Sequence, residues 1–327
     1  KMVKKVAILA NGGDVAGFNA VIRGIVKTAE NSGVECYGFI DGYNGLLKNE
    51  FERLSTAEDG NAEGILPKGG SIIGSSTNAN VFNYKVTNED GTVEYKDLSD
   101  VCVENIKKDG FDCIFTLGGD GTQKSARDFA TKGVNVIGVP KTIDNDINGT
   151  DMTFGFQSAI DIATRTLDEL HTTAKSHGRI MIAEIMGNKA GWLTLYSGIA
   201  GKADVILIPE IPYNIEKISQ YIKDKLKNGR KHIILAVAEG IISQEETKLS
   251  KKELKQKRAQ DGYISAGYRL ETELSEKIDG EVRVVVPGHI QRGGNPCAFD
   301  RVLTSRIGVK GAELILNKQY GRMVAVQ

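Results

Sequence analysis

The chain contains the run Ile233-Ile234-Leu235-Ala236-Val237, in which five consecutive side chains are apolar. A strand with one face toward solvent alternates apolar and polar residues, so an unbroken run indicates a strand that is covered on both faces. Such strands are typical of the centre of a parallel sheet between two layers of helices. The run therefore predicts an α/β fold.

Similar short, β-branched runs alternate with helix-like segments over most of the sequence. The predicted strands are Val6–Ala10, Glu35–Ile40, Cys113–Leu117, Val134–Val139, Arg179–Met186, Val205–Ile208, His232–Ala238 and Val282–Pro287. Helices are predicted between them, for example at Asn19–Ser32, Thr122–Thr131, Gln157–Thr173 and Ile215–Lys227. This alternation predicts doubly wound α/β layers with mostly parallel sheets, and 327 residues are enough for two such lobes.

The segment Glu245–Asp261 departs from this pattern, because it is dense in lysine, glutamate and glutamine. Such a composition is typical of a helix that meets solvent on all its faces. We expect a solvated helix on an insertion rather than a surface for a partner.

The composition excludes several classes of function. Lysine and arginine number 42, as do aspartate and glutamate, so no overall field attracts nucleic acid or an anionic membrane. The four cysteines form no CxxC pair and no metal-like spacing, and no apolar stretch is long enough to span a membrane. We therefore expect a cytoplasmic protein that binds neither nucleic acid nor membranes.

Glycine-rich segments follow two of the predicted strands, at the strand ends where α/β sheets bind ligands. Leu117-Gly118-Gly119-Asp120-Gly121-Thr122 joins a strand to a helix, so its N–H groups can approach phosphate oxygens and Asp120 can hold a magnesium ion. Asn11-Gly12-Gly13-Asp14 repeats this arrangement, without the GxGxxG spacing of a dehydrogenase or the signature of a P-loop. The alternative is a tight turn with a capping aspartate, and unrelated kinases of nucleotides and lipids also contain Gly-Gly-Asp-Gly.

The segment Pro140-Lys141-Thr142-Ile143-Asp144-Asn145-Asp146 follows the fourth predicted strand. Transfer of a phosphoryl group to an alcohol needs a carboxylate near the hydroxyl and polar or cationic groups near the moving phosphoryl group. Asp144 can accept the proton while Thr142 and Lys141 steady the transferring group. Asp146 can orient the sugar or the metal. An isolated segment of this kind would more often form a turn, but its position beside two phosphate loops favours catalysis.

A sugar phosphate also needs cations for its own phosphate group. Gly288-His289-Ile290-Gln291-Arg292-Gly293-Gly294 places His289 and Arg292 three residues apart after the last predicted strand, and Arg283 lies in that strand. A structural histidine and a surface arginine are the alternative interpretation. The flanking glycines and the chemistry of the other segments favour anion binding.

These motifs occur in the order found in 6-phosphofructokinases, and the chain resembles that family over nearly its whole length. The resemblance rests on Gly12-Gly13-Asp14, Gly17, Asn19, Asp41-Gly42-Tyr43, Gly118–Thr122, Pro140–Asp146, Met186-Gly187, Glu239 and Gly288–Gly294. No single motif is specific, but the combination is. It implies a kinase that uses magnesium and transfers the γ-phosphoryl group of ATP to the 1-hydroxyl of fructose 6-phosphate, giving fructose 1,6-bisphosphate in glycolysis.

The resemblance also implies roles for individual residues. Asp144 would be the general base, with Thr142 and Asp146 beside it, and Asp120 would serve the magnesium ion. The donor site would be lined by Gly13, Tyr43, Gly119, Gly121, Thr122 and Ser125. The sugar would contact Met186, Gly187 and Glu239, and its 6-phosphate would contact His289 and Arg292, joined by Arg179 and Arg283 from a neighbouring subunit.

Family members of this size have two lobes and form homodimers or homotetramers in which subunits share the sugar site. By this resemblance, a larger donor-binding lobe would comprise residues 1–155 and roughly 291–312. A smaller sugar-phosphate-binding lobe would comprise roughly 156–290 and the C-terminal segment 313–327.

Two departures from the family concern the donor side. The family usually has arginines where this chain has Asn188 and Thr77, the latter within Gly74-Ser75-Ser76-Thr77-Asn78. Both arginines lie near the transferring phosphate in the family, and Lys141 is a candidate to compensate for them. Pyrophosphate-dependent members have an acidic residue at position 121 and a lysine at position 141, so Gly121 indicates ATP and Lys141 indicates pyrophosphate. We favour ATP, because a side chain at position 121 would crowd the nucleotide.

Three alternatives remain: transfer from pyrophosphate, a weakly catalytic paralogue that binds sugar phosphate as a regulatory subunit, and a nucleotide or lipid kinase. Thr77 and Asn188 leave the regulatory paralogue open, whereas the intact Asp144, Thr142 and Asp120 argue against it. A nucleotide or lipid kinase leaves the segments 142–146 and 289–292 unexplained. A related sugar such as sedoheptulose 7-phosphate is an alternative acceptor.

Overall fold

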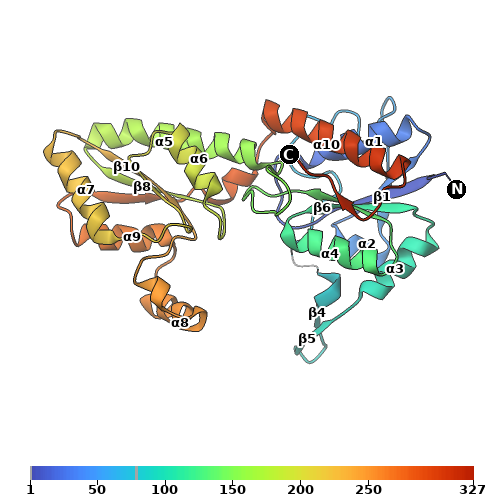
Figure 1. The fold of residues 1–327 in the computed structure, drawn as a ribbon, viewed down its shortest axis with the longest axis horizontal. Helices are drawn as coiled ribbons and strands as arrows, with labels where there is room; N and C mark the ends of the chain where they lie inside the picture. Colours follow the sequence, from blue (N-terminus) through green and yellow to red (C-terminus); the bar gives the residue numbers. More distant parts are fainter. Residues whose placement is uncertain (1, 78–79) are drawn as a thin grey trace. The chain divides into compact units, whose positions relative to one another are not determined.

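The computed structural model of the chain describes residues 2–77 and 80–327 (Figure 1). The chain divides into two compact units, each built around a sheet of its own. The first unit comprises the residues up to Ser158 together with Arg292–Gln327, and the second comprises Ala159–Gln291. Within the described part of the chain, no helix has both the length and the apolar composition that crossing a membrane requires.

The first unit contains a six-stranded sheet with the order β12-β7-β6-β1-β2-β3. Its strands are β1 (Lys5–Ala10), β2 (Glu35–Phe39), β3 (Phe51–Leu54), β6 (Cys113–Gly118), β7 (Val136–Pro140) and β12 (Arg322–Met323). Neighbouring strands pair in parallel except β2 and β3, which are antiparallel.

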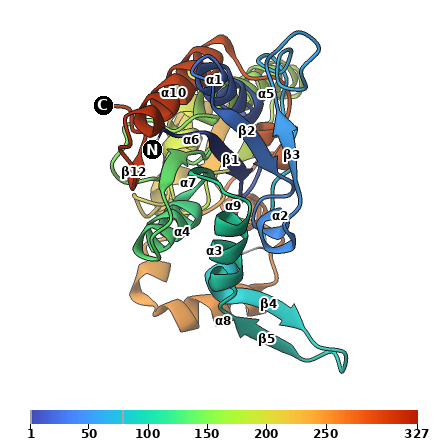
Figure 2. The same cartoon turned by 90° about the vertical axis from the view of Figure 1, so that its right-hand side faces the viewer.

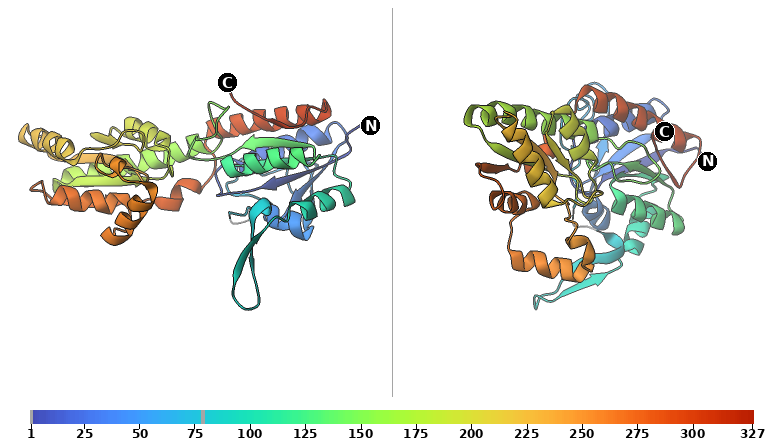
Figure 3. Two further views of the ribbon diagram at one scale, coloured as in Figure 1. Left: turned by 60° about the horizontal axis from the view of Figure 1, so that its bottom comes forward. Right: turned by 60° about the vertical axis from the view of Figure 1, so that its left-hand side comes forward.

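Helices cover both faces of this sheet, as Figure 2 shows. On one face lie α1 (Phe18–Glu30) and α10 (Ala298–Leu316), and on the other lie α2 (Tyr43–Lys48), α3 (Ser99–Lys108) and α4 (Asp120–Thr131). A short 3-10 helix, η1 (Val81–Asn83), leads into the hairpin of β4 (Tyr84–Thr87) and β5 (Val93–Lys96), which extends away from the sheet in Figure 3.

The second unit contains a four-stranded, entirely parallel sheet with the order β11-β8-β10-β9. Its strands are β8 (Ile180–Ile185), β9 (Val205–Leu207), β10 (Ile233–Ala238) and β11 (Val282–Val285). Its helices are α5 (Phe156–His177), which begins in the first unit, α6 (Trp192–Ala200), α7 (Ile215–Lys227), α8 (Lys251–Asp261) and α9 (Ala266–Ser275), with the 3-10 helices η2 (Glu246–Lys248) and η3 (Gly288–Arg292). Every residue of β8 and β10 is buried, as expected of central strands.

The α/β fold with mostly parallel sheets that the sequence predicts is confirmed. All eight predicted strands are present, and their ends differ from the prediction by at most two residues. The strands β3, β4, β5 and β12 are additional to those predicted.

The C-terminal segment lies elsewhere than expected. The resemblance implied that residues 313–327 would join the smaller lobe, but they belong to the first unit. The helix α10 continues without a break to Leu316, and Arg322 of β12 then pairs with Ile137 of β7. Because both elements belong to the layers of the first sheet, these residues stay with that unit.

Three of the four cysteines serve as packing residues. Cys36, Cys102 and Cys113 are buried, and burial raises the pKa of Cys36 and of Cys102 to about 12. Thiols with such pKa values are not nucleophiles at neutral pH.

Candidate active site

The loop that follows β1 is held by two neighbouring segments of the first unit. The N–H group of Asn11 donates to the carbonyl oxygen of Leu117 at 2.8 Å, and that of Gly12 donates to the carbonyl oxygen of Ser76 at 2.8 Å. The hydroxyl group of Ser75 donates to the carbonyl oxygen of Gly12 at 2.7 Å. Gly12 has a φ of 85°, which favours glycine. These bonds fix the first glycine loop at the carboxyl end of β1.

The second glycine loop leads from β6 directly into α4. Gly119 is the N-cap residue and no described side chain caps the helix, so the first N–H groups of α4 are available to a phosphate. Asp120 lies in the first turn, where its carboxylate pairs with Lys124 at 2.7 Å. A Cβ atom added to Gly121 would meet no atom of the described residues within 4 Å. The space beside position 121 is therefore open, as a bound nucleotide requires.

Three residues that the sequence assigned to the donor site are buried beneath it. The exposed fraction is 5% for Thr122, 6% for Ser125 and 1% for Tyr43. The hydroxyl group of Ser125 donates to the carbonyl oxygen of Gly121 at 3.2 Å. The ring of Tyr43 packs against that of Phe129, with centroids 6.0 Å apart, and burial raises the pKa of Tyr43. These side chains support the loop and α4 from within.

The segment Pro140–Asp146, called the acidic segment below, contains a buried lysine. The N–H group of Lys141 donates to the carbonyl oxygen of Gly118 at 3.0 Å, and only 3% of the residue is exposed. Its ammonium group donates to the carbonyl oxygen of Gly13 and lies 5.2 Å from the centre of the Phe18 ring. Burial, followed by the positive charge of Arg292, lowers the pKa of Lys141 to about 8. A charged side chain thus joins the acidic segment to the first glycine loop.

Thr142 and Asp144 form a tight turn. The hydroxyl oxygen of Thr142 accepts from the N–H group of Asp144 at 3.1 Å, and its carbonyl oxygen accepts from the hydroxyl group of Thr153 at 2.7 Å. Asn145 adopts a left-handed φ of 51°, and its side-chain oxygen accepts from the N–H group of Thr153 at 2.8 Å. The fully buried Thr153 therefore fixes the turn that carries Asp144. Sequence reasoning missed Thr153, because it lies outside the motif.

Asp146 and Asp120 lie close enough for their charges to interact. Burial raises the pKa of Asp146, and the carboxylate of Asp120 raises it further. Two neighbouring carboxylates fit Mg²⁺, which often binds through one or two carboxylates and takes phosphate and water oxygens as its other ligands. Among residues 2–77 and 80–327, no three Asp, Glu, His or Cys side chains gather to hold a metal by themselves. The residues present therefore fit a magnesium ion that is held jointly with phosphates.

Arg292 lies beside the first glycine loop. A Cβ atom added to Gly13 would collide with the guanidinium group of Arg292, and the same charge acts on Lys141. The sequence grouped Arg292 with His289, but His289 belongs to the second unit and Arg292 to the first. Two cations, Lys141 and Arg292, therefore converge on Gly13.

Met186, Gly187 and Glu239 come together at the carboxyl ends of β8 and β10 in the second unit. One carboxylate oxygen of Glu239 accepts from the N–H groups of Gly187 at 3.1 Å and Asn188 at 2.6 Å. The N–H group of Met186 donates to the side chain of Gln291 at 3.3 Å. Gln291 is 1% exposed and also donates to a carbonyl oxygen of η3 at 3.0 Å. Gln291 therefore ties the residues that follow β8 to the 3-10 helix η3. Sequence reasoning missed this role, although Gln291 stands inside the motif of residues 288–294.

Arg179 and Arg283 lie together at the opposite end of the same sheet. Both pair with Glu281, Arg179 at 2.8 Å. Arg179 precedes the first residue of β8, whereas Met186 follows its last, and a strand of 6 residues spans roughly 20 Å. Within one chain, these arginines and Met186 cannot contact the same sugar. His289 is exposed on η3, after the carboxyl end of β11.

The two positions at which the family has arginines are both exposed. Thr77 lies on the surface next to Ser76, whose carbonyl oxygen accepts from the N–H group of Gly12 in the first glycine loop. Asn188 has a left-handed φ of 52°. Asn78, which follows Thr77 in the same motif, falls outside the described residues. Neither replacement is imposed by the packing of a core.

Comparison with known proteins adds independent evidence. A sequence model described as Phosphofructokinase matches residues 5–315. The chain is 49% identical over 327 residues to ATP-dependent 6-phosphofructokinase 2 of Clostridium perfringens, covering 99% of this chain and 88% of that protein. It is 45% identical to ATP-dependent 6-phosphofructokinase 3 of Bacteroides thetaiotaomicron, covering 99% of this chain and 89% of that protein.

Solved structures agree on the fold. Phosphofructokinase from Saccharomyces cerevisiae gives a TM-score of 0.79 at 28% identity, over 96% of this chain and 42% of that chain. A pyrophosphate-dependent phosphofructokinase from Marinobacter aquaeolei gives a TM-score of 0.76 over 98% of this chain and 78% of that chain. Its identity of 23% supports the fold alone. The motifs, the fold and the full-length relatives lead to one conclusion: the chain belongs to the phosphofructokinase family.

Proposed function

We propose that the chain acts as an ATP-dependent 6-phosphofructokinase. In this reaction, a cytoplasmic step of glycolysis, the γ-phosphoryl group of ATP passes to the 1-hydroxyl of fructose 6-phosphate and gives fructose 1,6-bisphosphate. Relatives of similar length that are 40–49% identical carry this name. The structural observation that carries the proposal is the contact between Lys141 and Gly13, which joins the acidic segment to a phosphate loop.

Asp144 acts as the general base. It takes the proton of the 1-hydroxyl as that oxygen attacks the γ-phosphorus, and the bond from phosphorus to the oxygen of ADP breaks. The hydroxyl group of Thr142 holds the N–H group of Asp144, so the carboxylate starts from a fixed backbone. A fixed base needs little reorganisation when the sugar arrives.

Lys141 stabilises the charge on the transferring phosphoryl group. Arg292, which the family resemblance assigned to the 6-phosphate, joins it in this role because its guanidinium group lies beside Gly13. The family arginines expected at positions 77 and 188 are absent, so this charge needs other partners. The two cations beside Gly13 are already in place in the first unit. Cations that are positioned before the reaction stabilise developing charge more effectively than mobile ones.

ATP is the donor, and its phosphates bind at the first glycine loop and the first turn of α4. The open space beside Gly121 receives the nucleotide. Asp120 and Asp146 would hold a magnesium ion, which would neutralise negative charge on the phosphates. The full-length relatives at 40–49% identity are named ATP-dependent, so they do not support pyrophosphate, which Lys141 left open.

Fructose 6-phosphate binds in the second unit at the carboxyl ends of β8 and β10. Met186, Gly187 and Glu239 contact the sugar, and His289 contacts its 6-phosphate. Arg179 and Arg283 complete the site of a neighbouring subunit, because they lie at the far end of their own sheet. The enzyme is therefore a homodimer or a homotetramer.

A coupled assay tests the donor and the acceptor together. The purified enzyme is given ATP or pyrophosphate with fructose 6-phosphate or sedoheptulose 7-phosphate, and the phosphorylated sugar is measured. We expect turnover with ATP and fructose 6-phosphate. Turnover with pyrophosphate alone would overturn the choice of donor, and no turnover with either donor would favour the regulatory paralogue.

Gly121→Asp is the matched variant for this assay. Its side chain would enter open space, so the fold is kept while the nucleotide loses room and meets a like charge. We expect activity with ATP to fall by about a hundredfold or more. Unchanged ATP kinetics in this variant would contradict the proposed donor site.

A further inference from the structure

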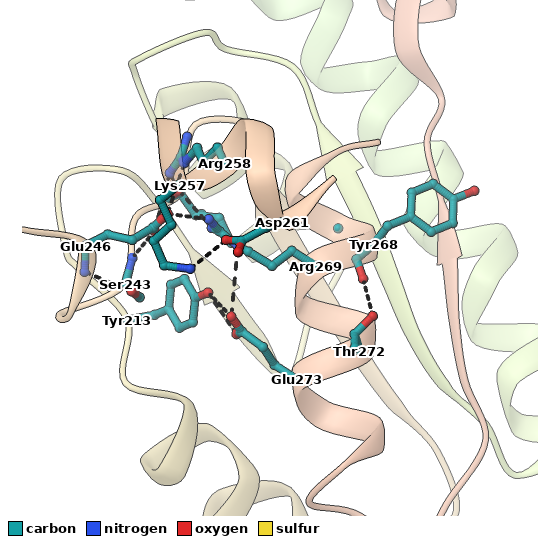
Figure 4. A network of polar contacts seen from close by, with 12 residues as sticks. Tyr213, Ser243, Glu246, Lys257, Arg258, Asp261, Tyr268, Arg269, Thr272 and Glu273 are labelled. Atoms are coloured by element: carbon teal, nitrogen blue, oxygen red, sulfur yellow. Dashed lines mark hydrogen bonds and ion pairs between the residues drawn. The ribbon is translucent and has the colours of Figure 1, made fainter. Parts of the chain in front are cut away.

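Arg258 of the helix α8 makes contacts that anchor the helix to its unit. No residue of α8 is buried, in keeping with the solvated helix that its composition predicts. Yet Glu246, which precedes α8 in the same lysine-rich segment, is only 4% exposed. Figure 4 shows Arg258 of α8 pointing into the polar network around Glu246.

Glu246 ties three segments of the second unit together. It pairs with Arg258 at 2.9 Å and with Arg269 of α9 at 2.6 Å. Its other carboxylate oxygen accepts from the N–H group of Ser243 at 2.9 Å. The two guanidinium groups also donate to one shared carbonyl oxygen, that of Ile241, at 3.0 Å from Arg258 and 3.2 Å from Arg269.

This network adjoins the proposed sugar contact. Ile241 stands two residues after Glu239, whose carboxylate holds the N–H groups of Gly187 and Asn188. A cavity of about 240 Å³ has Glu239 on its wall. The rest of that wall comes mainly from α8, the turn after it and α9, namely Arg258, Asp261, Tyr263, Ile264, Ser265, Ala266 and Arg269. The insertion therefore borders the space that Glu239 faces.

We propose that α8 is a wall of the acceptor pocket and that Arg258 is a positioning residue for Glu239. Through Glu246 and the carbonyl oxygen of Ile241, Arg258 holds residues 239–246 in place and thereby sets the affinity for the sugar phosphate. This inference rests on the proposed function, in which Glu239 contacts the sugar.

The charges predict that loss of Arg258 has a local effect. Glu246 keeps its closer partner Arg269, so a buried carboxylate is not left without a cation. The carbonyl oxygen of Ile241 likewise keeps its bond from Arg269. The variant loses the contacts that join α8 to residues 239–246, the segment that carries Glu239.

The test measures steady-state kinetics of the full-length enzyme and its variant Arg258→Ala. We expect the KM for fructose 6-phosphate to rise about tenfold, as for the loss of one charged hydrogen bond that positions a contact. The kcat and the KM for ATP should stay within about twofold, because the donor residues lie in the other unit. Arg258→Lys should recover part of the affinity, since lysine keeps the charge that pairs with Glu246 but lacks the forked guanidinium group that serves Glu246 and Ile241 together.

Lys257→Ala is the matched control, because Lys257 lies on the same helix and pairs with Asp261 at 2.5 Å instead of with Glu246. An unchanged KM in Arg258→Ala beside a functional wild type would overturn this inference alone. So would equal effects of Arg258→Ala and Lys257→Ala, or an equal rise in the KM for ATP. A wild-type enzyme that does not phosphorylate fructose 6-phosphate would overturn the proposed function and the inference with it. If Arg258→Ala does not fold, Arg258→Lys with a wild-type KM decides against the inference.

Discussion

At the scale of single residues, the charge of Lys141 is costly to the unliganded protein. Burial and the neighbouring Arg292 lower its pKa to about 8, so the side chain is still mostly protonated at neutral pH. Keeping the proton against such a shift costs roughly 3 kcal/mol of stability. A buried ammonium group of this kind is typical of a functional position, where activity is gained at the expense of stability.

Lys141→Met removes this charge and keeps most of the side-chain volume. We expect a higher melting temperature at neutral pH together with slower phosphoryl transfer. Between about pH 8 and pH 10 the unfolded wild type binds more protons than the folded wild type, so the wild type becomes more stable as the pH rises. The difference in melting temperature between Lys141→Met and the wild type therefore shrinks in this window. Thermal melts at about pH 7 and about pH 9.5 measure both effects.

The control for this comparison is Lys107→Met, which removes an exposed lysine of α3. Its melting temperature should change little at either pH. The expectation for Lys141 fails if Lys141→Met melts below the wild type at neutral pH, or if its gain is the same at both pH values.

The sequence could predict the residues that act within one loop, but not partners that are distant along the chain. Lys141 and Asp144 follow one strand in a short motif, so the motif itself places them. The approach of Arg292 to Gly13 joins the two ends of the chain and leaves no local pattern. The burial of Tyr43 beneath the donor site could not be predicted from the sequence either. An aromatic residue in a motif can pack into the core as well as line a ligand site.

At the scale of elements, buried strands can be predicted from the sequence and exposed or very short strands cannot. The strands that were predicted are apolar because helices cover both faces of their sheets. The hairpin of β4 and β5 leaves most of its residues exposed, β3 exposes its two central residues, and β12 has 2 residues, so none of them carries an apolar run. The solvated helix α8 was predictable from its charges, whereas the burial of Glu246 beside it depends on arginines from two helices.

The first turns of α5 and α10 are joined by one buried carboxylate. Asp300 is 0% exposed and accepts from the N–H groups of Gly155 at 3.1 Å and Ser158 at 2.8 Å, and from the hydroxyl group of Ser158 at 2.6 Å. Asp300→Ala leaves two buried N–H groups without this acceptor. We expect a loss of about 3–5 kcal/mol in the free energy of unfolding, measured by urea denaturation.

Ser158→Ala separates the two kinds of bond at this junction. It removes the hydroxyl group, which donates to Asp300 and accepts from the N–H group of Cys297 at 3.0 Å. The loss should be about 1–2 kcal/mol, because the N–H groups of Gly155 and Ser158 keep Asp300 as their acceptor. Similar losses in Asp300→Ala and Ser158→Ala would show that the carboxylate does not hold the junction.

At the scale of the whole molecule, the sheet of the second unit carries polar side chains at both ends of its strands, and the two ends have different proposed functions. One end carries Met186 and Glu239, and the other carries Arg179 and Arg283, which both pair with Glu281. In the proposed function, the half-buried Arg179 and the exposed Arg283 lie too far from the chain's own sugar site, and they suit the phosphate of a sugar bound by another copy. The equal numbers of basic and acidic residues, 42 of each, mean that no net charge opposes association.

Mixing two inactive variants tests whether subunits share the site. Asp144→Asn lacks the base but keeps both arginines, whereas the double variant Arg179→Ala, Arg283→Ala keeps the base but lacks them. Co-expressed with different affinity tags and purified as hybrids, they should regain a wild-type KM for fructose 6-phosphate at a fraction of the native sites, about half in a hybrid dimer.

The matched control combines Asp144→Asn with Asp120→Asn. Both residues belong to the first unit of one chain, so every site of this hybrid keeps one defect and its activity should not recover. Recovery limited to the arginine pair means that the arginines reach a neighbour's sugar phosphate, since mixing changes only which chains meet. Equal activity of the two hybrids would instead assign Arg179 and Arg283 to their own chain's surface, and the sugar site would then be complete within one subunit.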